Sequence, residues 1–151
     1  MKDDVDCVPM KRVIGIDLGS RRIGVAVTDG LGLTAQPHAT VERHGGQRDI
    51  DAIAAQVEAA GAERIVLGLP LDPQGQEGPA ALRARAFAEK LTAALGIPVD
   101  LIDESFSTVE AEEVLLAADL SRSRRKQVVD KLAAAVILQR WLDADRREEA
   151  R

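Results

Sequence analysis

Short apolar segments open the chain, and turns rich in glycine and polar residues separate them. Apolar and small residues dominate at 12–17 and 23–28, and a third such segment at 33–41 contains Pro37. Segments of this length between turn residues are typical of strands, and a proline inside one removes a hydrogen-bond donor. The first part of the chain is therefore predicted to form a three-stranded meander, with its third strand broken at Pro37.

The middle of the chain alternates between helical and strand-like patterns. Apolar residues spaced three and four apart predict helices at 47–60 and 79–95, and a glycine follows each of them. A continuous apolar run at 64–69 predicts a strand that is covered on both faces. A fifth strand is predicted at 99–104.

Two further helices are predicted in the last third of the chain. The stretch 107–118 begins with a capping-box pattern, which predicts a helix start, and a last helix is predicted from Ser123 through Trp141. The expected organisation is a disordered stub at 1–10, one domain at 11–142 and a frayed, charged tail at 143–151.

This order of elements predicts an α/β fold. A meander followed by helix-strand crossovers gives a mixed five-stranded sheet, in which antiparallel and parallel strands combine and helices cover both faces. Functional groups in such sheets gather at the carboxyl ends of the parallel strands. Asp17 and the pair Asp103 and Glu104 fall at predicted strand ends of this kind.

Composition narrows the function classes. The 151 residues carry a net charge of −5 and only two Phe, one Trp and no Tyr, so base stacking on an aromatic platform is poorly supported. With one cysteine, Cys7, neither an intramolecular disulfide nor a cysteine zinc cluster is available. The sequence has no apolar stretch of membrane-spanning length and no signal peptide, which predicts a cytoplasmic protein without a membrane partner.

Four carboxylates stand out by their context. Asp17 ends a buried strand between Gly15 and Gly19, so its solvation cost requires a partner, either a metal ion or a phosphate. Asp103 and Glu104 end the fifth strand, and Asp130 lies on an apolar face of the last helix. Carboxylates brought together favour a hard divalent cation, Mg²⁺ or Mn²⁺, and two such ions about 4 Å apart can activate a water for phosphodiester hydrolysis.

Each acid also has a purely structural interpretation. Asp17 could serve as a turn residue, and the pair Asp103 and Glu104 could cap the helix that follows. Asp130 could form a solvated pair with Lys126, one helical turn earlier. That all of these positions coincide at predicted strand ends and one helix face favours the metal interpretation.

Basic residues are the candidates for contact with a nucleic acid. If the sheet brings them to the same edge as the acids, a cationic rim would steer phosphates toward a metal site. A solvated charged surface is the alternative. The candidates are Arg21, Arg22, Arg83, Arg122, Arg124, Arg125 and Lys126.

Four segments together resemble one known family. They are IDLGSRRIGVA at 16–26, VLGLP at 66–70, the pair Asp103 and Glu104 with FST at 106–108, and Asp130 with Ala133, Ala134 and ILQ at 137–139. Over about 11–142 the chain resembles the YqgF (RuvX) family.

The resemblance implies an RNase H-like fold and a cytoplasmic bacterial nuclease that processes the 5′ end of pre-16S rRNA. It implies that Asp17, Glu104 and Asp130 hold Mg²⁺ or Mn²⁺ and are catalytic, with Asp103 as a substitute for Glu104. The family usually has Arg after the Asp-Glu pair, whereas this chain has Ser105. That departure leaves open which cation lies near the scissile phosphate.

Three other functions remain open at this point. A Holliday-junction resolvase acting on structured DNA would need a homodimer, because it cuts two strands symmetrically. A non-catalytic RNA-binding factor for ribosome assembly would keep the fold without turnover. The actin, Hsp70 and sugar-kinase superfamily shares the strand-turn-strand motif but closes two domains over ATP, and 151 residues supply only one.

Overall fold

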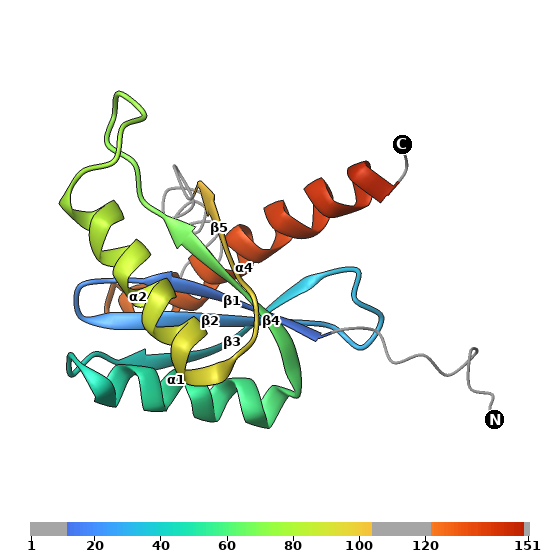
Figure 1. The fold of residues 1–151 in the computed structure, drawn as a ribbon, viewed down its shortest axis with the longest axis horizontal. Coiled ribbons are helices and arrows are strands. Elements are labelled where there is room, and N and C mark those ends of the chain that lie inside the picture. Colours follow the sequence, from blue (N-terminus) through green and yellow to red (C-terminus); the bar gives the residue numbers. More distant parts are fainter. Residues whose placement is uncertain (1–11, 104–121, 150–151) are drawn as a thin grey trace.

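The computed structural model describes residues 12–103 and 122–149, and in them one five-stranded mixed sheet forms the centre (Figure 1). The strands lie in the order β3-β2-β1-β4-β5. Their bounds are β1 Arg12–Leu18, β2 Arg22–Thr28, β3 Ala35–Glu42, β4 Ala62–Leu69 and β5 Val99–Asp103. β1, β2 and β3 pair antiparallel, whereas β4 pairs parallel with both β1 and β5. The predicted α/β architecture is confirmed.

Helices cover both faces of this sheet. On one face lie α1, Gln47–Ala60, and α2, Pro79–Leu95, and on the other face lies α4, Arg122–Glu149 (Figure 1). The helices α1 and α2 end where Gly61 and Gly96 adopt positive φ, so the sequence placed both ends correctly. The predicted helix at 107–118 and the residues Glu104 and Ser105 lie outside the described residues.

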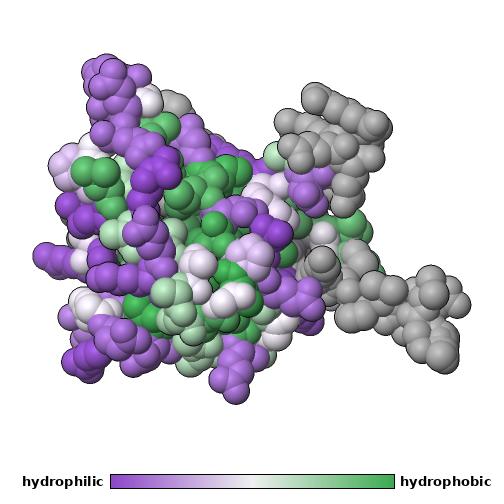
Figure 2. Space-filling model, in the orientation of Figure 1, coloured by the Kyte–Doolittle hydropathy of each residue, from purple (hydrophilic) through white to green (hydrophobic). Residues whose placement is uncertain are grey.

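Two apolar cores result from the alternation of side chains along the strands. Ile14, Ile16 and Leu67 face α1 and α2 and are fully buried, and they pack in one core with Phe87 and Leu91 of α2. The alternate positions Val13, Ala26 and Val66 face α4 and pack against Ala134, Ile137 and Leu138. The run at 64–69 is apolar because β4 is covered on both sides. Figure 2 shows one face of the molecule, where hydrophilic side chains form much of the margin and apolar side chains are visible between them.

Two expectations about the elements were wrong, one for the third strand and one for the end of the last helix. Pro37 does not break the third strand, because β3 is an edge strand and a register shift between its partners Val25 and Ala26 leaves His38 as the extra residue of a bulge. The last helix does not end at Trp141 but continues to Glu149. Most residues beyond Trp141 are Leu, Ala, Arg and Glu, which are good helix formers, and neither glycine nor proline interrupts them.

Candidate active site

Asp17 lies near the carboxyl end of β1 and is 7% exposed. Ile14 and Ile16 pack in the core beneath α1 and α2, so the alternation of the strand places Asp17 with Val13 on the α4 face. A carboxylate this buried in a strand needs compensation for its lost hydration. The sequence-based expectation that Asp17 is a buried strand-end acid is therefore met in the structure.

Asp130 reaches the same place because α4 docks directly on β2. Gly24 is paired with Asp17 across the antiparallel ladder. A Cβ atom built on Gly24 would lie 1.9 Å from the backbone oxygen of Asp130, so the helix backbone occupies the space that a side chain would need. The contact at Gly24 places the Asp130 turn of α4 beside the strand pair that carries Asp17.

A second close contact fixes the helix further along. A Cβ atom on Gly15 would lie 2.7 Å from Cβ of Leu138 and 3.0 Å from the backbone oxygen of Ala134. The small residues at 133–135, noted from the sequence, are buried at this interface. Glycines on the strands and alanines on the helix together let α4 approach the sheet closely at the site.

An ion pair joins the two elements at the site. The Nε atom of Arg22 donates to Oδ2 of Asp130 at 2.9 Å, and the side chains are 28% and 20% exposed. The structure pairs Asp130 with a cation from β2. The side chain of Lys126, the partner that the sequence suggested, lies outside the described residues. Arg22, expected to contact nucleic acid, thus also balances the charge of a candidate metal ligand.

Asp103 lies differently from Asp17 and Asp130. It is exposed at the end of β5, and strand alternation groups it with Leu101, which packs on the α1 and α2 face, while Ile102 packs against α4. Its backbone oxygen accepts a hydrogen bond from Nη1 of Arg140 at 3.3 Å. The structure therefore does not bring Asp103 to the face that Asp17 and Asp130 share.

Among the side chains that the structure describes, no three acidic, histidine or cysteine residues form a metal-binding group. The carboxylates that do share a face, Asp17 and Asp130, have the oxygen donors that Mg²⁺ and Mn²⁺ prefer. They fit part of such a site, and the third acid expected from the sequence, Glu104, lies outside the described residues.

The remaining basic candidates are dispersed. Arg21 is exposed in the β1–β2 turn, and Arg83 lies on α2, on the other face of the sheet from Asp130. Arg122, Arg124, Arg125 and Lys126 form the start of α4, and their side chains are outside the described part of the structure.

Sequence reasoning missed the residue that supports the β1–β2 turn, Asp49. It is 2% exposed at the third position of α1, and its carboxylate accepts hydrogen bonds from the backbone N–H groups of His44 at 2.8 Å and Gly45 at 3.0 Å. It also accepts from Nε of Arg43 at 3.4 Å. Burial by itself would raise the pKa of Asp49, but these hydrogen bonds and the Arg43 charge outweigh it and hold the pKa below its ordinary value.

The effect of this buried carboxylate reaches the turn after Asp17. Arg43, held by Asp49, donates from Nη1 to the backbone oxygen of Gly19 at 2.8 Å. The backbone N–H of Arg43 donates to the backbone oxygen of Arg21 at 2.9 Å. An acidic residue in the first turn of a helix after two glycines is the signal in the sequence that could have identified Asp49.

Solved structures of similar shape identify the class of fold. The chain is similar to Thermus thermophilus RuvC in complex with a Holliday junction substrate, with a TM-score of 0.55 and 19% identity over 91% of this chain and 97% of the other. A fowlpox virus resolvase bound to Holliday junction DNA gives a TM-score of 0.56 and 11% identity, over 88% of this chain and 97% of the other. These likenesses place the chain in the RNase H-like fold class.

Sequence comparison is more specific. The family model described as "RuvX: Holliday junction resolvase" matches residues 11–144. A Myxococcus xanthus protein named "Putative pre-16S rRNA nuclease" is 51% identical over 135 residues, which are 89% of this chain and 89% of the relative. A Syntrophomonas wolfei protein of the same name is 49% identical over 87% of this chain and 94% of the relative.

The chain therefore belongs to the RuvX family. It is a nuclease, an enzyme that hydrolyses phosphodiester bonds. The alternative assignment to the actin, Hsp70 and sugar-kinase superfamily is therefore set aside. Within the described residues, none of the helices combines the length and the hydropathy needed to cross a bilayer.

Proposed function

We propose that this nuclease is divalent-metal dependent and processes the 5′ end of pre-16S rRNA in the cytoplasm. One observation carries the site assignment: Asp17, 7% exposed, is paired across the sheet with the glycine on which the backbone of Asp130 rests. Two acids more than 100 residues apart in sequence are brought to one face, at the carboxyl end of β1. The substrate assignment is supported by the names of relatives about 50% identical to this chain.

Asp17, Asp130 and Glu104 would hold Mg²⁺ or Mn²⁺. Glu104 is preferred over Asp103 because Asp103 falls on the strand face away from Asp17. When bound, the metal would neutralise the carboxylates, activate a water and stabilise the leaving oxygen of the phosphodiester. Arg22 orients the Asp130 carboxylate through its 2.9 Å hydrogen bond, so one oxygen is held in place before any substrate arrives.

The test is cleavage of a pre-16S rRNA leader in Mn²⁺ or Mg²⁺ by the wild type and by Asp17→Asn, Asp130→Asn and Glu104→Gln. Each substitution removes one ligand charge at nearly constant size, so cleavage is expected to be lost. Because Asp130→Asn also weakens the ion pair with Arg22, every variant is assayed well below its own unfolding midpoint. Asp103→Asn is the matched control and is expected to cleave. Undiminished cleavage by Asp17→Asn would refute the assignment of Asp17 as a catalytic residue.

A resolvase is the second candidate, because the matching family is described by that activity. A four-way DNA junction should therefore be tested beside the RNA, with the solution mass measured on the same sample. Symmetric cutting of the junction by a homodimer would favour the resolvase. Affinity for RNA without cleavage in any divalent metal would instead favour a non-catalytic assembly factor.

A further inference from the structure

Two adjoining cavities lie on the face of the sheet that α1 and α2 cover, away from the Asp130 face. The smaller, of about 160 Å³, lies between the start of α1 and α2 and is lined by Arg43, Asp49, Arg83, Phe87 and Lys90 among others. The larger, of about 420 Å³, is lined by Leu18 at the end of β1 and by Gly19 and Ser20 of the β1–β2 turn. Arg43 and Arg83 line both cavities, so together they form one groove, here called the basic groove.

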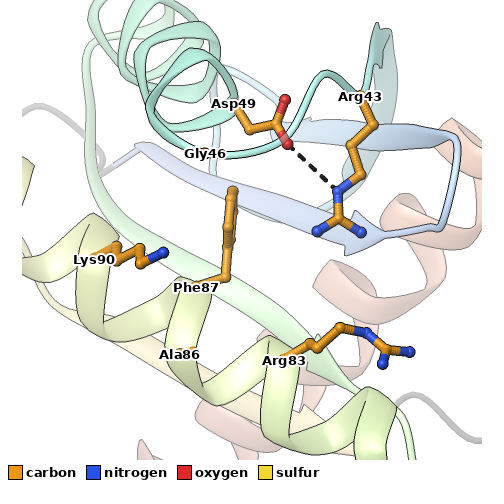
Figure 3. A pocket seen from close by; sticks show the side chains of 7 residues that line it. All are labelled: Arg43, Gly46, Asp49, Arg83, Ala86, Phe87 and Lys90. Atoms are coloured by element: carbon orange, nitrogen blue, oxygen red, sulfur yellow. Dashed lines mark hydrogen bonds and ion pairs between the residues drawn. The ribbon is translucent and has the colours of Figure 1, made fainter.

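The side chains around this groove converge from facing elements (Figure 3). Arg83, Phe87 and Lys90 repeat at helical spacing and form one stripe along α2, while Arg43 extends toward that stripe from the segment before α1. Phe87 is 7% exposed and contributes an apolar floor between the two charged residues of α2.

The charges of the groove are unbalanced. Arg43 is paired with Asp49 at 3.4 Å, but neither Arg83 nor Lys90 makes an ion pair with any side chain that the structure describes. Arg85, one position beyond Ala84 on the same helix, instead has both carboxylate oxygens of Glu77 at 2.6 Å. With the Asp49 charge included, the groove keeps an excess of two positive charges, and a bound anion balances them.

The position of the groove indicates what kind of anion it takes. Its larger part is lined by the turn that directly follows Asp17, so the groove and the acidic face lie on opposite sides of the end of β1. A polymer that places one phosphate at the acids can continue over this turn toward the groove.

We propose that the basic groove binds a backbone phosphate of the nucleic-acid substrate, away from the scissile bond. This inference rests on the proposed nuclease function and adds a second anchoring point to it. Because guanidinium and ammonium groups contact phosphates while Phe87 is buried, the groove reads no base sequence. It positions the strand and leaves specificity to other contacts.

The experiment measures binding without cleavage. The affinity of the wild type, Arg83→Ala, Lys90→Ala and the double variant for a pre-16S leader RNA is followed by fluorescence anisotropy in EDTA across a salt series. Each lost phosphate contact should lower the magnitude of the slope of log K against log[salt] by about 0.7 on single strands and about 0.9 on a duplex. The loss should be equal for RNAs of different sequence.

The matched control is Arg85→Ala, which removes the same charge from another side of α2 and should leave affinity and slope as in the wild type. An unchanged slope in the double variant overturns the proposal. Inorganic phosphate and a mononucleotide are titrated separately. If either binds the wild type tightly while the groove variants keep full RNA affinity, the groove serves a free anion and the proposal fails.

The same samples separate this inference from the proposed function. Asp17→Asn should keep the wild-type salt slope and lose cleavage in Mn²⁺. If Asp17→Asn cleaves but Arg83→Ala lowers the slope, the metal assignment fails and the groove stands. If Asp17→Asn fails to cleave and the groove variants bind as the wild type does, the groove alone is refuted.

Discussion

Gly24→Ala is the sharpest test of how the active site is assembled. The added Cβ would lie 1.9 Å from the backbone oxygen of Asp130 and 2.3 Å from its carbonyl carbon, whereas ordinary contact begins at 3.4 Å. The two backbones must therefore separate by about 1.5 Å. Neither is the end of a flexible side chain, so the adjustment falls on the docking of α4.

The expected cost has two parts. Inserting a methyl group into a packed interface typically costs about 1–3 kcal/mol of unfolding free energy, and a backbone contact of this kind belongs near the upper end of that range. A catalytic group displaced by about 1 Å can lose on the order of 10²-fold in rate. We therefore expect Gly24→Ala to lose about two orders of magnitude in cleavage rate under conditions in which it remains folded.

Two other glycines provide controls for the assay. Gly30→Ala meets no atom within 4 Å and should match the wild type in both urea unfolding and cleavage rate. Gly15→Ala meets Cβ of Leu138 at 2.7 Å, two helical turns beyond Asp130, and should lose stability with a smaller loss of rate. Each variant is assayed well below its own unfolding midpoint, with near-ultraviolet circular dichroism to confirm the folded state.

Two results would refute this reasoning. If Gly24→Ala is as stable and active as Gly30→Ala, the helix does not rest on β2 as described. If Gly24→Ala is destabilised but cleaves at the wild-type rate while folded, the position of Asp130 does not govern catalysis.

Two further predictions concern the charged groups near the site. The hydrogen bonds that lower the pKa of Asp49 stabilise the fold above its unfolded-state pKa of about 3.9, and this contribution is lost as pH falls through the lower folded-state pKa. The stability difference between wild type and Asp49→Asn in urea unfolding should thus be constant from about pH 5 to 8 and shrink below about pH 4; a constant difference down to pH 2 would contradict this. Arg22→Ala breaks the 2.9 Å ion pair with Asp130 and should lower the free energy of unfolding by about 1–3 kcal/mol. Mn²⁺ should raise the melting temperature of this variant more than that of the wild type, because the metal ion replaces the lost guanidinium charge. Equal shifts would argue against a metal at Asp130.

Much of the fold follows from local patterns. The continuous apolar run at 64–69 predicts a strand between two layers, and β4 has Ile65 and Leu67 in one core and Val66 in the other. The turn residues, and the glycines that follow the helices, predicted the order of the described elements correctly. The errors lie where context decides: Pro37 is tolerated because its strand is at an edge, and no local signal reveals which strand becomes an edge.

The site was predicted only as far as single residues are out of place. Asp17 and Asp130 drew notice because carboxylates on apolar faces need a reason. The residues that hold these two acids in place did not stand out in the sequence, because their role depends on contacts between distant segments. The Arg22–Asp130 pair spans 108 positions, and a glycine such as Gly24 looks the same in sequence whichever helix crosses it.

The docking of α4 also sets when this enzyme can become active. Asp17 and Arg22 are made early in synthesis, whereas the helix that carries Asp130 is the last element of the described chain. Since a domain folds as a unit and contacts distant in sequence form slowly, β1 and β2 have no partner helix to pack against until α4 has been made. Under the proposed metal assignment, a growing chain therefore has an incomplete acidic site, and it becomes able to cut nucleic acid only when the final helix has packed on the sheet.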